Sequence, residues 1–175
     1  YSNTGGQTSK SSNTGTIAKF ASIGKKTQKK DLARIALSYP NTYVAQISMG
    51  ANMQQTINAL TEAEKHKGPS IIIAYSPCIS HGIKGGMENT IEQEKMAVQS
   101  GYFPLFRYNP IDNKLLLDYK EPKFDTFFDF LNSQNRFAML KAVNKDNADI
   151  LLEELKKEAM ERFKFYENLY IATNK

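Results

Sequence analysis

The segment Gly68-Pro69-Ser70-Ile71-Ile72-Ile73-Ala74-Tyr75-Ser76-Pro77-Cys78 decides the fold of this chain. Gly68-Pro69 interrupts any preceding helix, and residues 70–75 form a short β-branched and aromatic run that favours a buried strand. Cys78 follows that strand after Pro77, at the sheet edge where α/β proteins usually bind ligands. The segment therefore predicts a strand that carries a functional residue at its carboxyl end.

Strands and helices alternate on both sides of this segment. A strand is expected over 42–48, and Asn52 can cap a helix that continues to Lys65. The apolar residues of that helix have helical spacing and are expected to face the core: Met53, Ile57, Leu60 and Ala63. Further helices are expected over 32–39, capped by Asp31, and over 90–100, ended by Gly101, and further strands over 102–108 and 114–119. This alternation predicts an α/β fold with a mostly parallel sheet covered by helices.

The C-terminal part of the chain is expected to be helical. Helices are predicted over 124–131 and 136–143, followed by one long amphipathic helix over 147–172. Its apolar residues lie on or near one face: Ile150, Leu151, Leu155, Ala159, Phe163, Tyr166 and Tyr170. We expect this stripe to pack on the domain, with docking of a partner as the alternative. The resulting division is a domain over 1–140 and a C-terminal helical extension over 141–175.

Composition indicates a cytoplasmic globular domain. The chain has 175 residues, of which 41% are hydrophobic, and no apolar run approaches the ~20 residues of a membrane span. Its single cysteine excludes an internal disulfide and fits a reducing compartment. The net charge of +5 has a cluster at Lys25, Lys26, Lys29 and Lys30, but no aromatic residues interleave with it. We interpret the cluster as a solvated basic loop, with the docking of an acidic electron-carrier protein as the alternative, and expect neither a nucleic-acid nor a membrane partner.

Two short motifs contain the residues that are candidates for chemistry. Tyr1-Ser2-Asn3-Thr4-Gly5-Gly6-Gln7 combines small polar side chains with a glycine pair, which suits a loop that approaches a ligand, although such a string also occurs in flexible tails. Cys78 has three interpretations on its own. It is a buried small side chain, a nucleophile with His81 as its base, or part of a zinc half-site whose remaining ligands are missing, since His66 is expected in the tail of a helix.

Together these two motifs resemble the C-terminal part of the pyruvate:ferredoxin (flavodoxin) oxidoreductases, thiamine diphosphate and iron–sulfur enzymes of anaerobic metabolism. The resemblance runs from Tyr1 to about Phe137 and includes Arg107-Tyr108-Asn109-Pro110. The sequence departs from the family at Ser12-Asn13-Thr14-Gly15, where Thr-Pro-Thr-Gly is usual. The resemblance implies that residues 1–140 are the C-terminal portion of a thiamine diphosphate-binding domain.

The resemblance also implies roles for individual residues. Tyr1, Ser2 and Asn3 match the rim of the thiamine diphosphate site, and Asn3 matches a position close to the thiazolium that is important for turnover. An amide there can donate a hydrogen bond to a developing oxyanion without titrating. Cys78 matches a thiolate ligand of the [4Fe–4S] cluster nearest the thiamine. The ligands of Mg²⁺ and the other cluster cysteines are implied to lie upstream of Tyr1.

The expected function is therefore part of an oxidoreductase. The parent enzyme is implied to oxidise pyruvate with coenzyme A to acetyl-CoA and CO₂ and to pass electrons through [4Fe–4S] clusters to ferredoxin or flavodoxin. Its expected partners are the rest of the parent polypeptide and a second copy in a homodimer, and this segment alone is expected to be inactive. Two alternatives are a related oxidoreductase for another 2-oxoacid and a non-catalytic interaction module. An organelle of an anaerobic eukaryote is the alternative to the cytoplasm.

Overall fold

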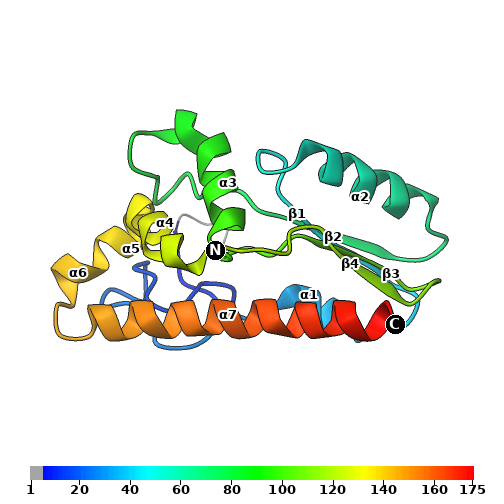
Figure 1. Cartoon of the computed structure of the whole chain (residues 1–175). Helices are drawn as coiled ribbons and strands as arrows, with labels where there is room; N and C mark the ends of the chain where they lie inside the picture. Colours follow the sequence, from blue (N-terminus) through cyan, green and yellow to red (C-terminus); the bar gives the residue numbers. More distant parts are fainter. Residues whose placement is uncertain (1–5) are drawn as a thin grey trace.

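A four-stranded sheet with helices on both faces forms the centre of the computed structural model, which describes residues 6–175 (Figure 1). The strand order is β2–β1–β3–β4. The strands are β1 (Tyr43–Ile47), β2 (Ser70–Ala74), β3 (Phe106–Asn109) and β4 (Lys114–Leu117). Helix α2 (Met53–Lys65) covers one face, and α1 (Leu32–Ala36) and α7 (Ala148–Thr173) cover the other. The α/β class with helices over the sheet is confirmed.

The sheet is mixed. Parallel pairing, which the alternation of elements predicts, is found between β1 and β2, with Val44 opposite Ile71. Strands β3 and β4 instead pair antiparallel because the tight turn over residues 110–113 reverses the chain, and β3 also runs antiparallel to β1. Asn113 adopts the left-handed conformation in that turn, with φ of 48°.

Strand β2 lies at the edge of the sheet, with β1 as its partner among the described residues. Its residues Ile71, Ile72 and Ile73 are only partly buried, and Ser70 and Ala74 are exposed. The prediction of a buried strand is therefore wrong for β2, whereas every residue of the adjacent β1 is buried. An apolar run identifies a strand but does not reveal how many neighbours the strand has.

The predicted helix caps are confirmed. The Asn52 side chain accepts a hydrogen bond from the Gln55 backbone N–H at 2.9 Å, at the start of α2. The Asp31 carboxylate accepts one from the Arg34 backbone N–H at 3.1 Å, at the start of α1. Helix α3 (Thr90–Gln99) ends just before Gly101, whose φ is 77°. Local capping rules therefore locate these boundaries to within a few residues.

Helix α2 presents an unexpected face to the sheet. Its predicted core residues Met53, Ile57 and Leu60 are 54%, 49% and 52% exposed. The buried residues are instead Gln55, Thr56 and Ala59. Gln55 Nε2 donates hydrogen bonds to the Gln46 carbonyl and to an Asp118 carboxylate oxygen, both at 3.0 Å. The predicted orientation of α2 is therefore wrong for these three residues, although the fourth, Ala63, is partly buried and packs against the core. Polar contacts and the small residue Ala59 set the packing of α2 on the sheet.

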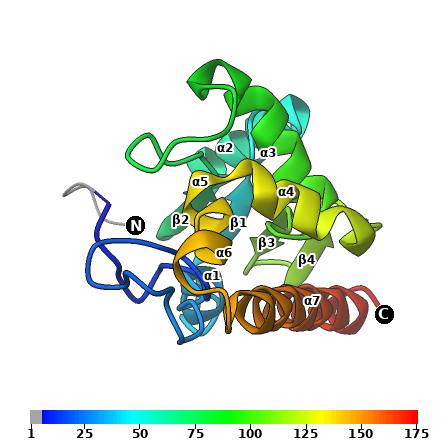
Figure 2. The same cartoon turned by 90° about the vertical axis from the view of Figure 1, so that its left-hand side faces the viewer.

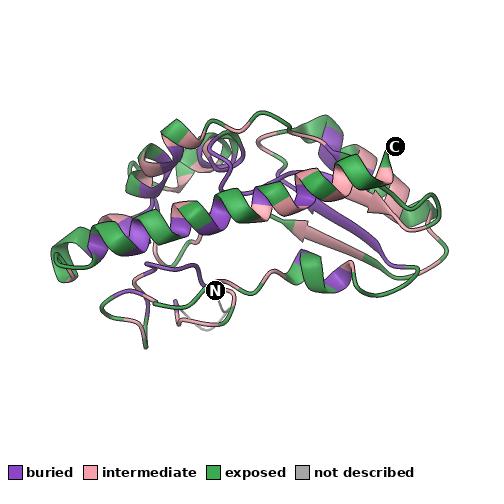
Figure 3. Cartoon of the chain, turned by 60° about the horizontal axis from the view of Figure 1, so that its bottom comes forward, coloured by how far each residue is buried: buried purple, intermediate pink, exposed green. Residues whose placement is uncertain are grey.

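The C-terminal helices build the main core. Short helices precede α7, whose buried side follows the predicted stripe, with Leu151, Leu155, Ala159, Phe163 and Tyr166 buried (Figure 3). Ile150 is an exception to the predicted stripe because it is 66% exposed. The short helices are η1 (Met87–Asn89), η2 (Phe124–Thr126), α4 (Phe127–Ser133), α5 (Asn135–Ala138) and α6 (Leu140–Val143). Figure 2 shows α7 nearly end-on beneath the sheet.

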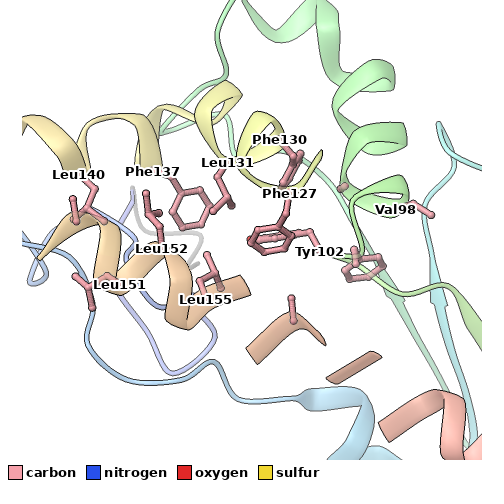
Figure 4. Packing of buried hydrophobic residues seen from close by; sticks show 14 of the residues in the cluster. Val98, Tyr102, Phe127, Phe130, Leu131, Phe137, Leu140, Leu151, Leu152 and Leu155 are labelled. Carbon is pink, nitrogen blue, oxygen red and sulfur yellow. The ribbon is translucent and has the colours of Figure 1, made fainter. Parts of the chain in front are cut away.

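An aromatic cluster joins α4 and α5 to α7 (Figure 4). Tyr102 stacks obliquely on Phe130, with 4.7 Å between the ring centroids, and Phe127 and Phe137 surround it. The predicted strand over 102–108 begins only at Phe106, because residues 102–105 are inserted into this core. Among residues 6–175, no helix has the length and apolar character that crossing a membrane requires.

The loop over residues 6–31 packs against α7 although it contains no helix and only isolated bridges. Ser12, Asn13, Thr14 and Thr16 are buried. The Thr14 hydroxyl donates a hydrogen bond of 2.7 Å to the buried Glu158 carboxylate of α7. Because burial without hydrogen bonds is costly for polar groups, such contacts specify one conformation for the described part of this loop.

Candidate functional site

Cys78 lies beyond the carboxyl end of β2, as predicted. Its carbonyl accepts a hydrogen bond of 2.8 Å from the Gly82 N–H, which closes a turn over residues 78–82. Gly82 has a φ of 71°, which an L-residue rarely adopts. Cys78 is only partly buried, unlike a structural core cysteine. The turn therefore holds the sulfur at the surface of the sheet's edge.

His81 is the immediate polar neighbour of the thiol. The Cys78 Sγ and His81 Nδ1 atoms lie 3.1 Å apart, so the Cys-x-x-His spacing does bring the two side chains together. Burial lowers the pKa of His81 and the Arg136 charge lowers it further, while a backbone hydrogen bond at Ile17 raises it. The ring is therefore neutral near pH 7, and depending on its tautomer it accepts the thiol proton or donates a hydrogen bond to a thiolate.

The end of the Tyr1–Gln7 motif lies close to His81. Gly6 lies so close to His81 that a Cβ at this position would stand 3.3 Å from the His81 Cε1 atom. The structure thus brings the end of the Tyr1–Gln7 motif beside the turn that holds Cys78. The predicted site residues Tyr1, Ser2 and Asn3 themselves lie outside the described residues. Their predicted roles at thiamine diphosphate remain predictions.

Cys78 opens onto a cavity of about 780 Å³ at the carboxyl end of β2. Its wall includes residues from the first loop, from the segment after β2, from α5 and from α7. Four cationic side chains line it, namely Lys29, Lys30, Arg136 and Arg162, whereas Asp31 is the single carboxylate among the described lining residues. The cavity is therefore electropositive and large enough for a prosthetic group.

Tyr102 fixes two of these cations. Its hydroxyl oxygen accepts hydrogen bonds from Arg136 Nη2, at 3.3 Å, and from Asn13 Nδ2. Its backbone carbonyl accepts one of 2.7 Å from Arg162 Nη2. The sequence interpretation did not identify Tyr102, Arg136 or Arg162. The available signal was that Arg136 directly precedes the apolar run Phe137-Ala138-Met139-Leu140, because arginine is rarely buried without a specific reason.

The interpretation of the lysine cluster is partly wrong. Lys26 and Lys30 are exposed, as a solvated loop requires, but Lys25 and Lys29 are partly buried. The Lys25 ammonium donates a hydrogen bond of 2.6 Å to the Ser12 carbonyl. Burial lowers the pKa of Lys29 to about 8, and the charges of Arg162 and Arg136 contribute next. These two lysines therefore belong to the packed loop and the cavity wall.

The described residues do not form a metal site by themselves. They contain no group of three or more histidine, cysteine or acidic side chains that could hold an ion. His66 is hydrogen-bonded to the Asn41 carbonyl at 3.0 Å, so it takes no part in a zinc half-site with Cys78. A partly buried cysteine on a large cavity fits one corner of an iron–sulfur cluster. The same Cys78–His81 pair also has the geometry of a nucleophile and its base.

The known proteins that are similar to this chain are named as pyruvate oxidoreductases or pyruvate dehydrogenases. No protein-family model matches the chain. The chain is 47% identical over 174 residues to a pyruvate-flavodoxin oxidoreductase of Klebsiella pneumoniae, and equally so to a pyruvate:ferredoxin oxidoreductase of Moorella thermoacetica. In both cases the match covers 97% of this chain and 15% of the relative. The predicted resemblance is confirmed, and the chain spans about a seventh of the length of these relatives.

The match extends further than the motifs indicate. Coverage of 97% leaves only a few residues unmatched, so the similarity continues beyond Phe137 into α7. The chain is also 41% identical over 179 residues to a mitochondrial pyruvate dehydrogenase [NADP(+)] of Euglena gracilis, covering 99% of the chain and 10% of that protein. The loop, the cavity wall and the last helix are therefore parts of one shared segment.

Proposed function

We propose that this chain, which is similar over nearly its whole length to one segment of the pyruvate-flavodoxin and pyruvate:ferredoxin oxidoreductases, performs that segment's role in an enzyme of the same kind. The 47% identity over 97% of the chain carries the proposal. The parent enzyme oxidises pyruvate with coenzyme A to acetyl-CoA and CO₂ and releases two electrons and a proton. The names of the three relatives described above each specify pyruvate, which favours it over another 2-oxoacid.

Cys78 provides one thiolate to a [4Fe–4S] cluster in this proposal, and the other three ligands come from the rest of the parent polypeptide. The incomplete burial of Cys78, the 780 Å³ cavity and the cationic wall support this role, because a thiolate-bound cluster is an anion that needs room and compensating charge. The cluster supplies one-electron transfer when bound. His81, with Nδ1 at 3.1 Å from the sulfur, is placed to donate a hydrogen bond to the thiolate.

Asn3, with Tyr1 and Ser2, contributes to the thiamine diphosphate site, with Mg²⁺ held by residues of the parent outside this chain. The contact of Gly6 with His81 supports this assignment, because it brings the end of the same motif beside the cluster thiol. Electron transfer between the two cofactors requires that they lie close together. The amide of Asn3 orients the reacting carbon and donates a hydrogen bond to the developing oxyanion.

The final electron acceptor is determined elsewhere in the parent. The segments that match this chain occur in proteins named for flavodoxin, for ferredoxin and for NADP⁺. We propose ferredoxin or flavodoxin as the acceptor, a homodimeric parent and a cytoplasmic location.

The test is made on the full-length parent enzyme, purified without oxygen. We expect reduction of methyl viologen that requires both pyruvate and coenzyme A, with little reduction when 2-oxoglutarate replaces pyruvate. Asn3→Ala is expected to lower kcat about 100-fold or more, the usual cost of one oxyanion donor. Lys26→Gln, on the exposed side of the same segment, is the matched control and keeps full activity. A parent without pyruvate-dependent reduction would overturn the proposal.

Cys78→Ser distinguishes the two roles of the cysteine. A cluster ligand predicts the loss of bound iron and of one EPR signal of the reduced enzyme, together with loss of viologen reduction. A nucleophile predicts loss of activity with the iron content and all EPR signals unchanged. The second result would show that Cys78 is not a ligand of the cluster.

A further inference from the structure

The cationic wall of the cavity beside Cys78 is assembled from three separate parts of the chain. Lys29 comes from the first loop, Arg136 from α5, and Arg162 from the middle of α7. More than a hundred residues separate Lys29 from either arginine, so the fold alone gathers these charges. Like charges repel more strongly when protein replaces water around them. Such a cluster therefore destabilises the folded chain unless an anion accompanies it.

The hydrogen bonds described for the wall end mostly on neutral groups. Arg136, only 4% exposed, and Arg162 both donate to oxygens of Tyr102. Within residues 6–175, Lys29 and Arg162 form no ion pair. The carboxylate of Asp31, which also lies on the wall, accepts hydrogen bonds from the Tyr166 hydroxyl at 2.9 Å and from the Arg34 N–H. The wall consequently has excess positive charge that points to an anionic occupant.

The charges of the wall act on one another. Burial, and after it the charges of Arg162 and Arg136, lowers the pKa of Lys29 to about 8, as expected for cations within electrostatic range of one another. An anion in the cavity would oppose the part of this lowering that the arginine charges cause. The thiol of Cys78 opens onto the same space, so any group bound to it lies within the field of these cations.

We propose that Lys29, Arg136 and Arg162 form an electropositive wall that raises the reduction potential of the iron–sulfur cluster bound through Cys78. The inference rests on the proposed function. Reduction adds one electron to the cluster, with no bond broken and no proton required, and increases its negative charge by one. Fixed positive charges stabilise the reduced form more than the oxidised form. The electron comes from pyruvate oxidation in the parent enzyme, and from dithionite in the test.

The test is a potentiometric titration of the full-length holoenzyme, followed by EPR spectroscopy. The signal that Cys78→Ser removes identifies the relevant cluster. We expect Lys29→Gln and Arg162→Gln each to shift its midpoint to a lower potential, by about a tenfold change in the ratio of reduced to oxidised cluster, which is ~59 mV for one electron. Lys26→Gln removes an exposed charge from the same loop, outside the cavity lining, and should leave the midpoint unchanged.

Arg162→Lys separates charge from structure. It keeps the positive charge but changes the hydrogen bond to the Tyr102 carbonyl. A midpoint close to that of the wild type supports the electrostatic role, whereas a shift equal to that of Arg162→Gln overturns it. Iron analysis verifies that each variant holds its cluster. If Arg162→Gln loses the cluster, Lys29→Gln decides the outcome.

Failure of this inference is distinct from failure of the proposed function. Variants with full iron content and an unchanged midpoint overturn the electropositive wall while the cluster assignment stands. If Cys78→Ser leaves every cluster signal intact, no cluster is bound through Cys78. The proposed role of Cys78 and the electropositive wall are then both overturned.

Discussion

Lys29 leads to a prediction for the stability of the 175-residue chain. Burial, followed by the charges of Arg162 and Arg136, lowers its pKa from 10.5 to about 8 in the folded state. For a base with a lowered pKa, the folded state binds fewer protons than the unfolded state between these two values. Its contribution to stability is therefore largest above the unfolded pKa and is lost as the pH falls through about 8.

The magnitude follows from proton linkage. At pH 7 the side chain is protonated in nearly all folded and unfolded molecules, so Lys29 contributes no gain there. At pH 9.5 it is mostly neutral in the folded state and still mostly charged in the unfolded state. Integrating the difference in bound protons between these pH values gives a rise of about 2 kcal/mol in the free energy of unfolding due to Lys29 alone.

The assay is urea unfolding of the wild type and of Lys29→Met at pH 7 and pH 9.5. Methionine keeps an unbranched side chain without the ammonium group. The rise in the free energy of unfolding between the two pH values should be smaller in the variant by about 2 kcal/mol, with an unchanged m-value. Lys30→Met, at the exposed neighbour, is the control and should respond like the wild type. Equal responses of the wild type and Lys29→Met would refute the reasoning.

Three further substitutions test the packing. Burial raises the pKa of Glu158, although the hydrogen bond from Thr14 acts to lower it. The charged form of Glu158 is therefore destabilising at neutral pH, whereas the protonated form is not. Glu158→Gln, which retains an acceptor for Thr14, should therefore raise Tm more at pH 7 than at pH 4, and equal gains would contradict this. Phe130→Ala, in the core against Tyr102, should lower the free energy of unfolding by about 3–5 kcal/mol in urea titrations. Ile57→Ser, on the half-exposed face of α2, should lower it by less than about 1 kcal/mol, and similar losses for the two would contradict the burial pattern.

The element types were predictable because short-range rules determine them. Asp31, Asn52 and Gly101 end or begin helices through contacts within a few residues, and the structure contains each helix that they predict. The orientation of α2 was not predictable in this way. Helical periodicity shows which face is apolar, but the Gln55 contacts with β1 and Asp118 decide which face meets the sheet.

The same distinction between local and long-range contacts applies to the candidate site. The pairing of Cys78 with His81 follows from a three-residue spacing within one turn, and sequence reasoning identified it. The wall of the cavity depends on Arg136 and Arg162 meeting Lys29 across the fold, and no local pattern indicates that meeting. Burial of Lys29 was missed for the same reason, since a run of lysines is ordinarily solvated.

The edge position of β2 has a practical consequence for preparing this chain. An edge strand presents unpaired backbone N–H and C=O groups, and Ile71, Ile72 and Ile73 give this one an apolar, β-prone surface. Natural sequences often place a lysine or proline at such a position to prevent aggregation, and Ser70–Ala74 contains neither. Solubility at high concentration, more than folding, is therefore expected to limit work on the isolated chain.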